Sequence, residues 1–163
     1  MSKSNQEHLR VLCARRLLLW VLFLLVLAGC GMKTMSGGFL GTATVTLTSA
    51  TYYASAPTSE SASDVLADLS ESGNLVTLRF GNTSLLANCD LKASITNGTA
   101  YIIDGPVCES DVGGMLRTIN IAGGSVAVGD YGDADVIIRV DGFTGVSNSG
   151  DGFVLDFRGK SKK

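Results

Sequence analysis

The sequence is poor in the residue types on which most enzyme active sites depend. It contains one histidine, His8, and one tryptophan, Trp20, and charged residues make up only 17% of the chain. An imidazole is the usual general base near neutral pH, so a chain without one beyond residue 8 is a poor candidate for triad or acid–base catalysis. Gly123-Gly124 is no phosphate-binding loop, because no Lys-Ser/Thr follows it. We therefore expect a protein that is not an enzyme and has no cofactor.

Basic residues are also scarce in the bulk of the chain. The formal net charge is −2, and four of the basic residues precede residue 17. The one later cluster is Lys160, Lys162 and Lys163, which a solvated tail over residues 160–163 explains. Nucleic-acid binding requires a basic patch, so we expect no nucleic-acid partner.

Long hydrophobic runs are absent except near the N-terminus. Residues 17–27 are apolar throughout, and Arg10, Arg15 and Arg16 precede them. A membrane-spanning helix needs about 20 apolar residues, so an uncleaved transmembrane anchor is the less favoured interpretation. A basic start, a short apolar middle and small residues behind it are the layout of a secretory signal peptide.

The end of this run, Leu27-Ala28-Gly29-Cys30, resembles the lipobox of bacterial lipoproteins. The resemblance implies a signal peptide over residues 1–29, cleavage before Cys30, and diacylglycerol and fatty acid on that cysteine. Residues 30–39 would then be the lipidated cysteine and a flexible tether. Gly31 stands where lipoproteins retained in the inner membrane of enteric bacteria carry aspartate, which implies the outer membrane of a bacterial cell envelope.

The four cysteines fall into separate roles under this reading. Cys13 leaves with the signal peptide and Cys30 takes the lipid, so Cys89 and Cys108 remain. Because disulfides persist outside the cytosol, we predict a Cys89–Cys108 bridge. Two cysteines are too few for a structural zinc site, which needs four ligands.

Residues 40–159 alternate between apolar and polar with a period of two, which is typical of half-buried strands. The Ser/Ala-rich stretch ending near Ser63 is predicted as a loop, and residues 64–70 fit a strand better than a short helix. Other strands are predicted around Thr42–Thr48, Leu75–Phe80, Cys89–Thr96, Thr99–Asp104, Leu116–Ala122, Ser125–Gly129, Val136–Val140 and Phe153–Phe157.

Two dipeptides predict tight hairpins. Asn97-Gly98 favours a turn with two positive φ angles, which would pair Ile95 with Ala100, Ala93 with Ile102 and Leu91 with Asp104. Continued to Pro106, this register makes Cys89 and Cys108 diagonal neighbours at ~7–8 Å. Gly123-Gly124 predicts a second turn, which would pair Ile121 with Val126 and Ile119 with Val128.

Eight or nine short strands joined mostly by hairpins predict an all-β fold. The favoured architecture is a single antiparallel up-and-down meander that closes into a small barrel, with a β-sandwich as the alternative. This arrangement resembles a small lipocalin-like barrel, although the Gly-x-Trp motif of lipocalins is missing.

The one candidate metal site is acidic. Asp130, Asp133 and Asp135 place three carboxylates within six residues, and Ca²⁺ prefers oxygen ligands. Their spacing does not match an EF-hand loop, and an acidic hairpin turn is the favoured interpretation.

Three functions are compatible with this pattern. The favoured one is a lipid-anchored, non-catalytic envelope protein that serves a structural or protein-interaction role, bound to the membrane and to an envelope protein partner. The alternative is a lipocalin-like carrier of a small apolar ligand, since small barrels are either filled by side chains or hold one ligand. A hydrolase that uses carboxylates is the least favoured.

Overall fold

The computed structural model describes residues 34–48, 58–81, 85–87, 89–103, 107–112, 115–145 and 151–162, all within the compact unit Lys33–Lys163. The expected signal segment 1–29 and Cys30 lie outside these residues. The described residues form nine strands and no helix. The strands are β1 (Gly37–Thr48), β2 (Thr58–Ser72), β3 (Leu75–Phe80), β4 (Leu91–Thr96), β5 (Thr99–Ile102), β6 (Val107–Val112), β7 (Met115–Val128), β8 (Val136–Thr144) and β9 (Asp151–Ser161).

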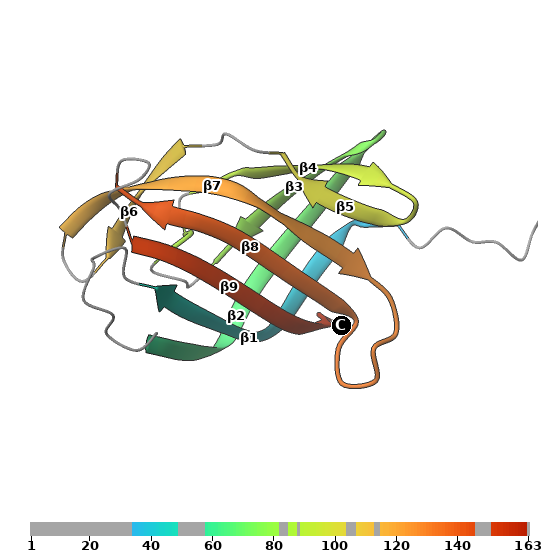
Figure 1. Ribbon diagram of the computed structural model, residues 1–163. Coiled ribbons are helices and arrows are strands. Elements are labelled where there is room, and N and C mark those ends of the chain that lie inside the picture. The colour runs from blue at the N-terminus through green and yellow to red at the C-terminus, as the bar shows by residue number, and fades with distance from the viewer. Residues whose placement is uncertain are drawn as a thin grey trace, which may run out of the picture. The chain divides into compact units, whose positions relative to one another are not determined.

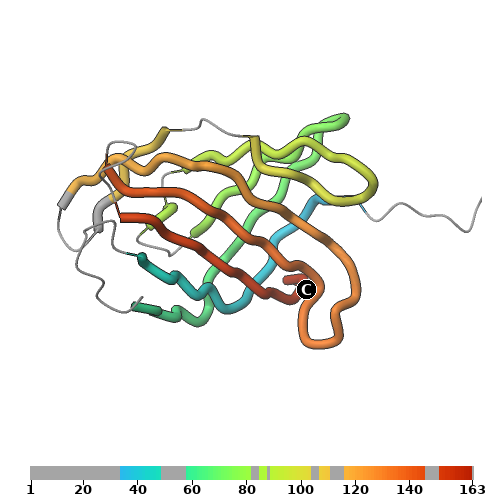
Figure 2. Tube along the Cα trace, in the orientation of Figure 1, coloured from blue at the N-terminus to red at the C-terminus, as the bar shows by residue number. Residues whose placement is uncertain are grey.

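The nine described strands form one antiparallel meander, and eight of these strands close into a barrel. Neighbours follow the order β5-β4-β3-β2-β1-β9-β8-β7-β6, and β5 also pairs with β7, which closes the ring (Figure 1; Figure 2). β6 pairs with β7 outside that ring. Closure gives the terminal strand β5 a partner on its second side. The predicted all-β up-and-down barrel is therefore confirmed, with a lipocalin-like architecture rather than a sandwich.

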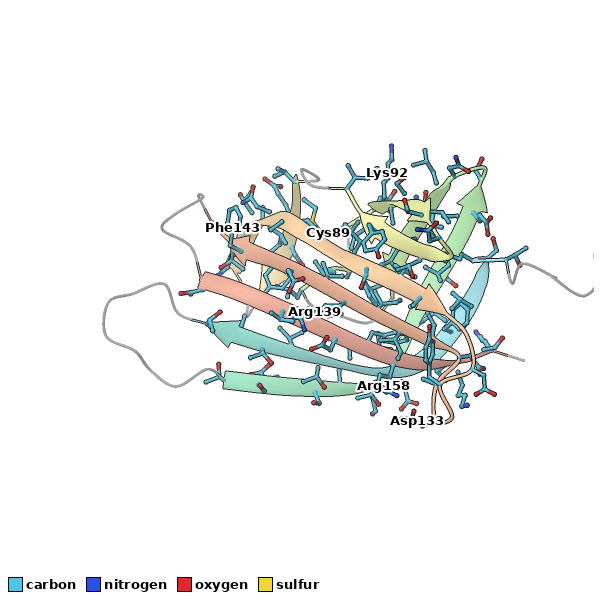
Figure 3. The ribbon with its side chains drawn as sticks, turned by 45° about the vertical axis from the view of Figure 1, so that its right-hand side comes forward. Cys89, Lys92, Asp133, Arg139, Phe143 and Arg158 are labelled. Carbon is cyan, nitrogen blue, oxygen red and sulfur yellow. A yellow bond between two sulfur atoms is a disulfide. The ribbon has the colours of Figure 1, made fainter. Side chains whose placement is uncertain are left out.

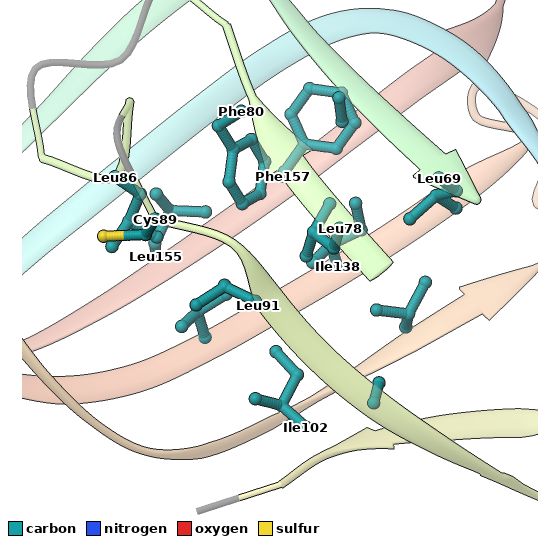
Figure 4. Close-up of a cluster of buried hydrophobic side chains, with 14 of the residues drawn as sticks. Leu69, Leu78, Phe80, Leu86, Cys89, Leu91, Ile102, Ile138, Leu155 and Phe157 are labelled. Atoms are coloured by element: carbon teal, nitrogen blue, oxygen red, sulfur yellow. The ribbon is translucent and has the colours of Figure 1, made fainter. Parts of the chain in front are cut away.

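Apolar side chains fill the barrel because each strand turns alternate residues inward. On β9, Phe153, Leu155 and Phe157 are buried, as their alternation predicts. The rings of Phe80 and Phe157 meet edge to face with centroids 5.8 Å apart (Figure 4). Fully burying such a side chain stabilises the fold by ~1.5–3 kcal/mol. Small eight-stranded barrels have an interior of about this capacity.

The connection between β3 and β4 also contributes to this core. Leu85 and Leu86 are 5% and 0% exposed, and the N–H of Cys89 donates to the carbonyl of Leu86 at 3.0 Å. Figure 4 shows Leu86 and Cys89 in the same cluster as Leu155. The connection thus packs its leucines inside the barrel.

The β4–β5 hairpin has the predicted turn and register. Asn97 and Gly98 both have positive φ, 52° and 79°. Ile95 pairs with Ala100 and Ala93 with Ile102, as predicted. The further predicted pair, Leu91 with Asp104, lies outside the described residues.

β2 confirms one prediction and corrects another. Val65, Ala67 and Leu69 are buried in alternation, so residues 64–70 form a strand, as favoured. The loop predicted through Ser63 is wrong from Thr58 onward, because β2 begins at Thr58 and its residues 58–62 pair with β1. Residues 49–57 lie outside the described residues. Residues 58–64 are exposed on both faces, so no apolar alternation marks this half of the strand.

Gly123-Gly124 is not a hairpin turn, which corrects the second predicted hairpin. β7 runs unbroken from Met115 to Val128, and its register against β8 shifts between Ile121 and Gly123. Both glycines have positive φ, 156° and 146°, and a Cβ on Gly124 would lie 2.1 Å from the carbonyl oxygen of Arg139. Glycine inside a strand often marks such a bulge or a close backbone approach. Ile121 and Val126 therefore do not pair across a turn, nor do Ile119 and Val128.

The folded region extends beyond the predicted boundaries 40 and 159. β1 begins at Gly37, and Met35 and Phe39 are each only 4% exposed. These residues belong to the barrel, so the predicted tether over 30–39 is too long. β9 continues to Ser161, which places Lys160 of the predicted tail in the sheet.

β6 has no counterpart among the predicted strands. Its inward positions, as judged by burial, are occupied by Cys108 and Ser110, and its outward positions by Val107 and Glu109. Its apolar Val107 therefore faces outward and its polar Ser110 faces inward, so β6 lacks the alternation of inward apolar and outward polar residues that predicts a strand.

Candidate functional site

The structure brings Cys89 and Cys108 together at disulfide distance, with their Cα atoms 5.5 Å apart. Cys89 lies two residues before the start of β4 and is 1% exposed, while Cys108 lies on β6 opposite Ile119 of β7. The strand pairing that brings the two cysteines together differs from the predicted one, because β6 pairs with β7 instead of extending the β4–β5 ladder. Pro106, through which that ladder was predicted to continue, lies outside the described residues. The bond joins the β3–β4 connection to β6 (Figure 3).

Asp130, Asp133 and Asp135 all lie in the connection between β7 and β8, but each bonds to a different group. Asp130 accepts from the N–H of Gly132 at 3.0 Å, and Asp133 accepts from the guanidinium of Arg158 at 2.6 Å. Asp135 accepts from the N–H of Ser161 at 2.9 Å. The arrangement therefore ties the acidic connection between β7 and β8 to the end of β9.

The Arg158–Asp133 pair has a clear electrostatic consequence. The hydrogen bond from Arg158, reinforced by its charge, holds the pKa of the Asp133 carboxyl below its usual value. Arg79 has the same effect on the pKa of Asp90. Both pairs are solvent-exposed, so they contribute little to stability.

Among the described residues, no three His, Cys, Asp or Glu side chains lie in an arrangement that could hold a metal ion. A depression of about 380 Å³ lies on the outer face of β2 and β3. It is lined by Asp68, Leu69, Ser70, Thr77 and Arg79.

Exposed apolar side chains are the feature that sequence reasoning missed. Seven large ones are exposed among the described residues. Four of them, Leu40, Leu75, Tyr101 and Tyr131, lie toward one end of the barrel. The available signal was an outward apolar residue in β1, β3 and β5, and a tyrosine in the connection between β7 and β8. The others are Ile103, Val107 and Leu116.

We call the end of the barrel near Leu40, Leu75, Tyr101 and Tyr131 the proximal end. It carries the start of β1, the turns at residues 73–74 and 97–98, the connection 129–135 and the end of β9. Backbone hydrogen bonds tie these parts together, from Ile95 to Asn74, from Asp135 to Gly159 and from Lys162 to Gly38. Figure 3 shows Asp133 at this end and Phe143 at the opposite end.

Comparison of the chain with protein-family models, with curated proteins and with solved structures finds no match in any of the three. Among the described residues, no helix is long and apolar enough to span a bilayer.

Proposed function

We propose that this protein is a lipid-anchored lipoprotein of a bacterial cell envelope, with a barrel that serves as a non-catalytic structural or protein-interaction module. The observation that carries the proposal is the sequence Leu27-Ala28-Gly29-Cys30 behind a basic segment and a short apolar run. That layout is typical of a cleaved signal rather than of a membrane span. The lipid on Cys30 provides the membrane attachment.

Two features of the barrel support this assignment. The Cys89–Cys108 pair is suited to an oxidising compartment outside the cytosol. The barrel also begins close behind Cys30, since the N–H of Met35 is already bonded to Glu71 at 2.6 Å. A short connection of this kind suits a domain held at a membrane surface.

We do not extend the proposal to the carrier alternative. Large side chains, including Phe80, Phe153 and Phe157, occupy the barrel interior. A carrier of an apolar ligand requires a cavity lined by such groups, whereas here the same groups pack against one another.

The proposal is tested by isolating the full-length protein from a bacterium fed an alkyne-bearing fatty acid. We expect the label to enter the wild type, and intact-mass and peptide spectra to place the N-terminus at Cys30 with diacylglycerol on its sulfur. Cys30→Ala should abolish labelling and cleavage, while the matched control Cys13→Ala should leave both unchanged. An intact Met1 together with an unmodified Cys30 thiol would overturn the proposal.

A further inference from the structure

The proximal end of the barrel is the part of the described chain that follows the lipid anchor most closely in the sequence. Thr34 follows Cys30 by four residues, and an extended chain advances ~3.3–3.6 Å per residue, so their Cα atoms are at most about 14 Å apart. β1 then runs away from this end for 12 residues, which corresponds to about 40 Å along the strand. The chain thus enters the barrel at its proximal end.

The entry point is fixed, not free to swing. The N–H of Met35 donates to Glu71 of β2 at 2.6 Å, and the N–H of Glu71 donates to Ser36 at 3.0 Å. The Met35 side chain is 4% exposed and belongs to the core cluster. The short connection to Cys30 therefore leaves from a defined place beside the β2–β3 turn.

Apolar side chains are exposed around this same end. Leu75 follows the β2–β3 turn and is 47% exposed, and Tyr131 lies in the β7–β8 connection. Tyr101 of β5 lies in the same row as Leu75, because both residues pair with Ser94 of β4. Leu40 faces outward on β1 beside Lys160. Tyrosine and leucine suit the boundary between headgroups and acyl chains, because one part of that boundary is apolar and the other wet.

Two acidic side chains at this end, Asp133 and Asp135, have cationic partners that lessen repulsion from anionic headgroups. Arg158 bonds to Asp133 at 2.6 Å, and Lys160 lies 3.7 Å from Asp135. The ammonium of Lys160 also donates to the carbonyl of Gly132 at 2.7 Å. The connection 129–135 is thus a compact, largely charge-balanced surface.

We infer that the proximal end, with Leu40, Leu75, Tyr101 and Tyr131 at its rim, rests on the lipid surface, and that β6 and the start of β7 face away from it. This inference rests on the lipid anchor of the proposed function. It commits to lipid as the occupant, because the length of chain between Cys30 and Thr34 brings this end to the bilayer. The far side of the barrel is then left for a protein partner.

The test measures which part of the barrel lies near lipid headgroups. The full-length protein is processed in cells, purified and reconstituted into phosphatidylethanolamine–phosphatidylglycerol vesicles that contain a nitroxide-headgroup lipid. One fluorophore is placed at Asn74→Cys, in the β2–β3 turn, and in a second protein at Glu109→Cys, on β6. Both positions are exposed. We expect quenching at residue 74 to exceed that at residue 109 several-fold.

Paired substitutions test the apolar rim itself. Leu75→Ser with Tyr131→Ser should reduce quenching of the Asn74 label, while the matched pair Val107→Ser with Leu116→Ser should leave it unchanged. Circular dichroism checks that each variant is folded. Equal quenching at both label positions, or stronger quenching at residue 109, would overturn the inference.

Flotation separates failure of the inference from failure of the anchor. If the protein floats with vesicles but the Asn74 label is unquenched, the orientation is wrong and the lipid anchor stands. If this label is shielded in cells but unquenched in vesicles, a protein covers the proximal end and the inference is again wrong. If the protein lacks lipid and does not float, both proposals fail together.

Discussion

Strands β7 and β9 both lie inside the sheet, yet their neighbours hold them differently. β9 pairs with β1 over Gly152–Ser161 and with β8 over Asp151–Gly159, and neither ladder shifts register. β7 pairs with β8 through a shifted ladder, and its other side is divided between β6, at residues 115–120, and β5, at residues 125–127. The pairing along which the barrel closes is therefore interrupted at β7. We call the junction of β5, β6 and β7 the seam.

The difference shows where this fold needs additional devices. Local opening of a protein costs least where backbone pairing is interrupted and packing is sparse. Two such features of the described chain, the Gly123-Gly124 pair and the Cys89–Cys108 bond, lie at this seam. We call β9 with its partners β1 and β8 the β9 wall. This wall is held by continuous pairing of β9 and by core packing of Phe153, Leu155 and Phe157.

The largest loss of stability is expected when a glycine of the seam is replaced by alanine. A Cβ on Gly124 would meet the carbonyl oxygen of Arg139 at 2.1 Å, whereas a Cβ on Gly123 would meet nothing within 4 Å. Both positions have positive φ. With about 1–3 kcal/mol for backbone strain and a similar amount for overpacking, we expect Gly124→Ala to lower the free energy of unfolding by ~4 kcal/mol and Gly123→Ala by ~2 kcal/mol. Urea unfolding of the full-length protein measures both.

The adjacent glycine is the control, because it shares the strained backbone but not the clash. Equal losses for Gly123→Ala and Gly124→Ala would contradict the close approach of β7 and β8 at this bulge. A larger loss for Gly123→Ala would place the close approach to β8 at residue 123 instead of residue 124.

The second effect concerns the disulfide. Cys89 and Cys108 are separated by 19 residues, and closing a loop of this size stabilises the folded state by about 3 kcal/mol. We expect Cys89→Ala with Cys108→Ala to lower the free energy of unfolding by that amount. Amide hydrogen exchange should accelerate more in β6 and residues 85–87 than in β9, because β6 otherwise depends on β7.

Reduction of the wild type is the matched control for this pair. Dithiothreitol removes the bond but leaves both side chains, so it separates bond loss from packing loss. If reduction accelerates exchange in β6 and β9 by the same factor, the bond stabilises the whole barrel and not the seam.

Sequence reasoning succeeded where side-chain burial follows the alternation of residues or where a turn has a distinctive residue pair. Val136, Ile138 and Val140 on β8 alternate strictly, and burial follows the alternation. The Asn97-Gly98 turn was predictable with its register because few residue pairs adopt two consecutive positive φ angles.

Gly123-Gly124 was misread because two structures give the same side-chain pattern. A two-residue turn would place Ile121 and Val126 on one face, and a bulge that adds one residue to a strand does the same. Both side chains are buried in the barrel. Only the pairing of β7 with β8 on both sides of the glycines distinguishes the two, and that pairing is not local in the sequence.

The candidate site was predictable only in part. The alternation of residues does not reveal which outward positions gather at one end, since Leu40, Leu75 and Tyr131 come from distant parts of the chain. The Cys89–Cys108 pair followed from cysteine number and compartment, but its path through β6 did not, because Cys108 and Ser110 occupy that strand's inward positions.

The smallest effect is expected on the β9 wall. The hydrogen bond from Arg158 holds the pKa of Asp133 below its usual value, so this pair stabilises the fold at neutral pH and loses its effect as pH falls through the lowered pKa. Arg158→Gln should raise the pKa of Asp133 toward its usual value, measured by carboxyl NMR titration. Lys162→Gln, which removes a nearby cation with no bond to Asp133, should leave that pKa unchanged. Because the pair is exposed, hydrogen exchange in β6 should be the same in both variants. Faster exchange there in Arg158→Gln alone would show that the β9 wall and the seam are coupled.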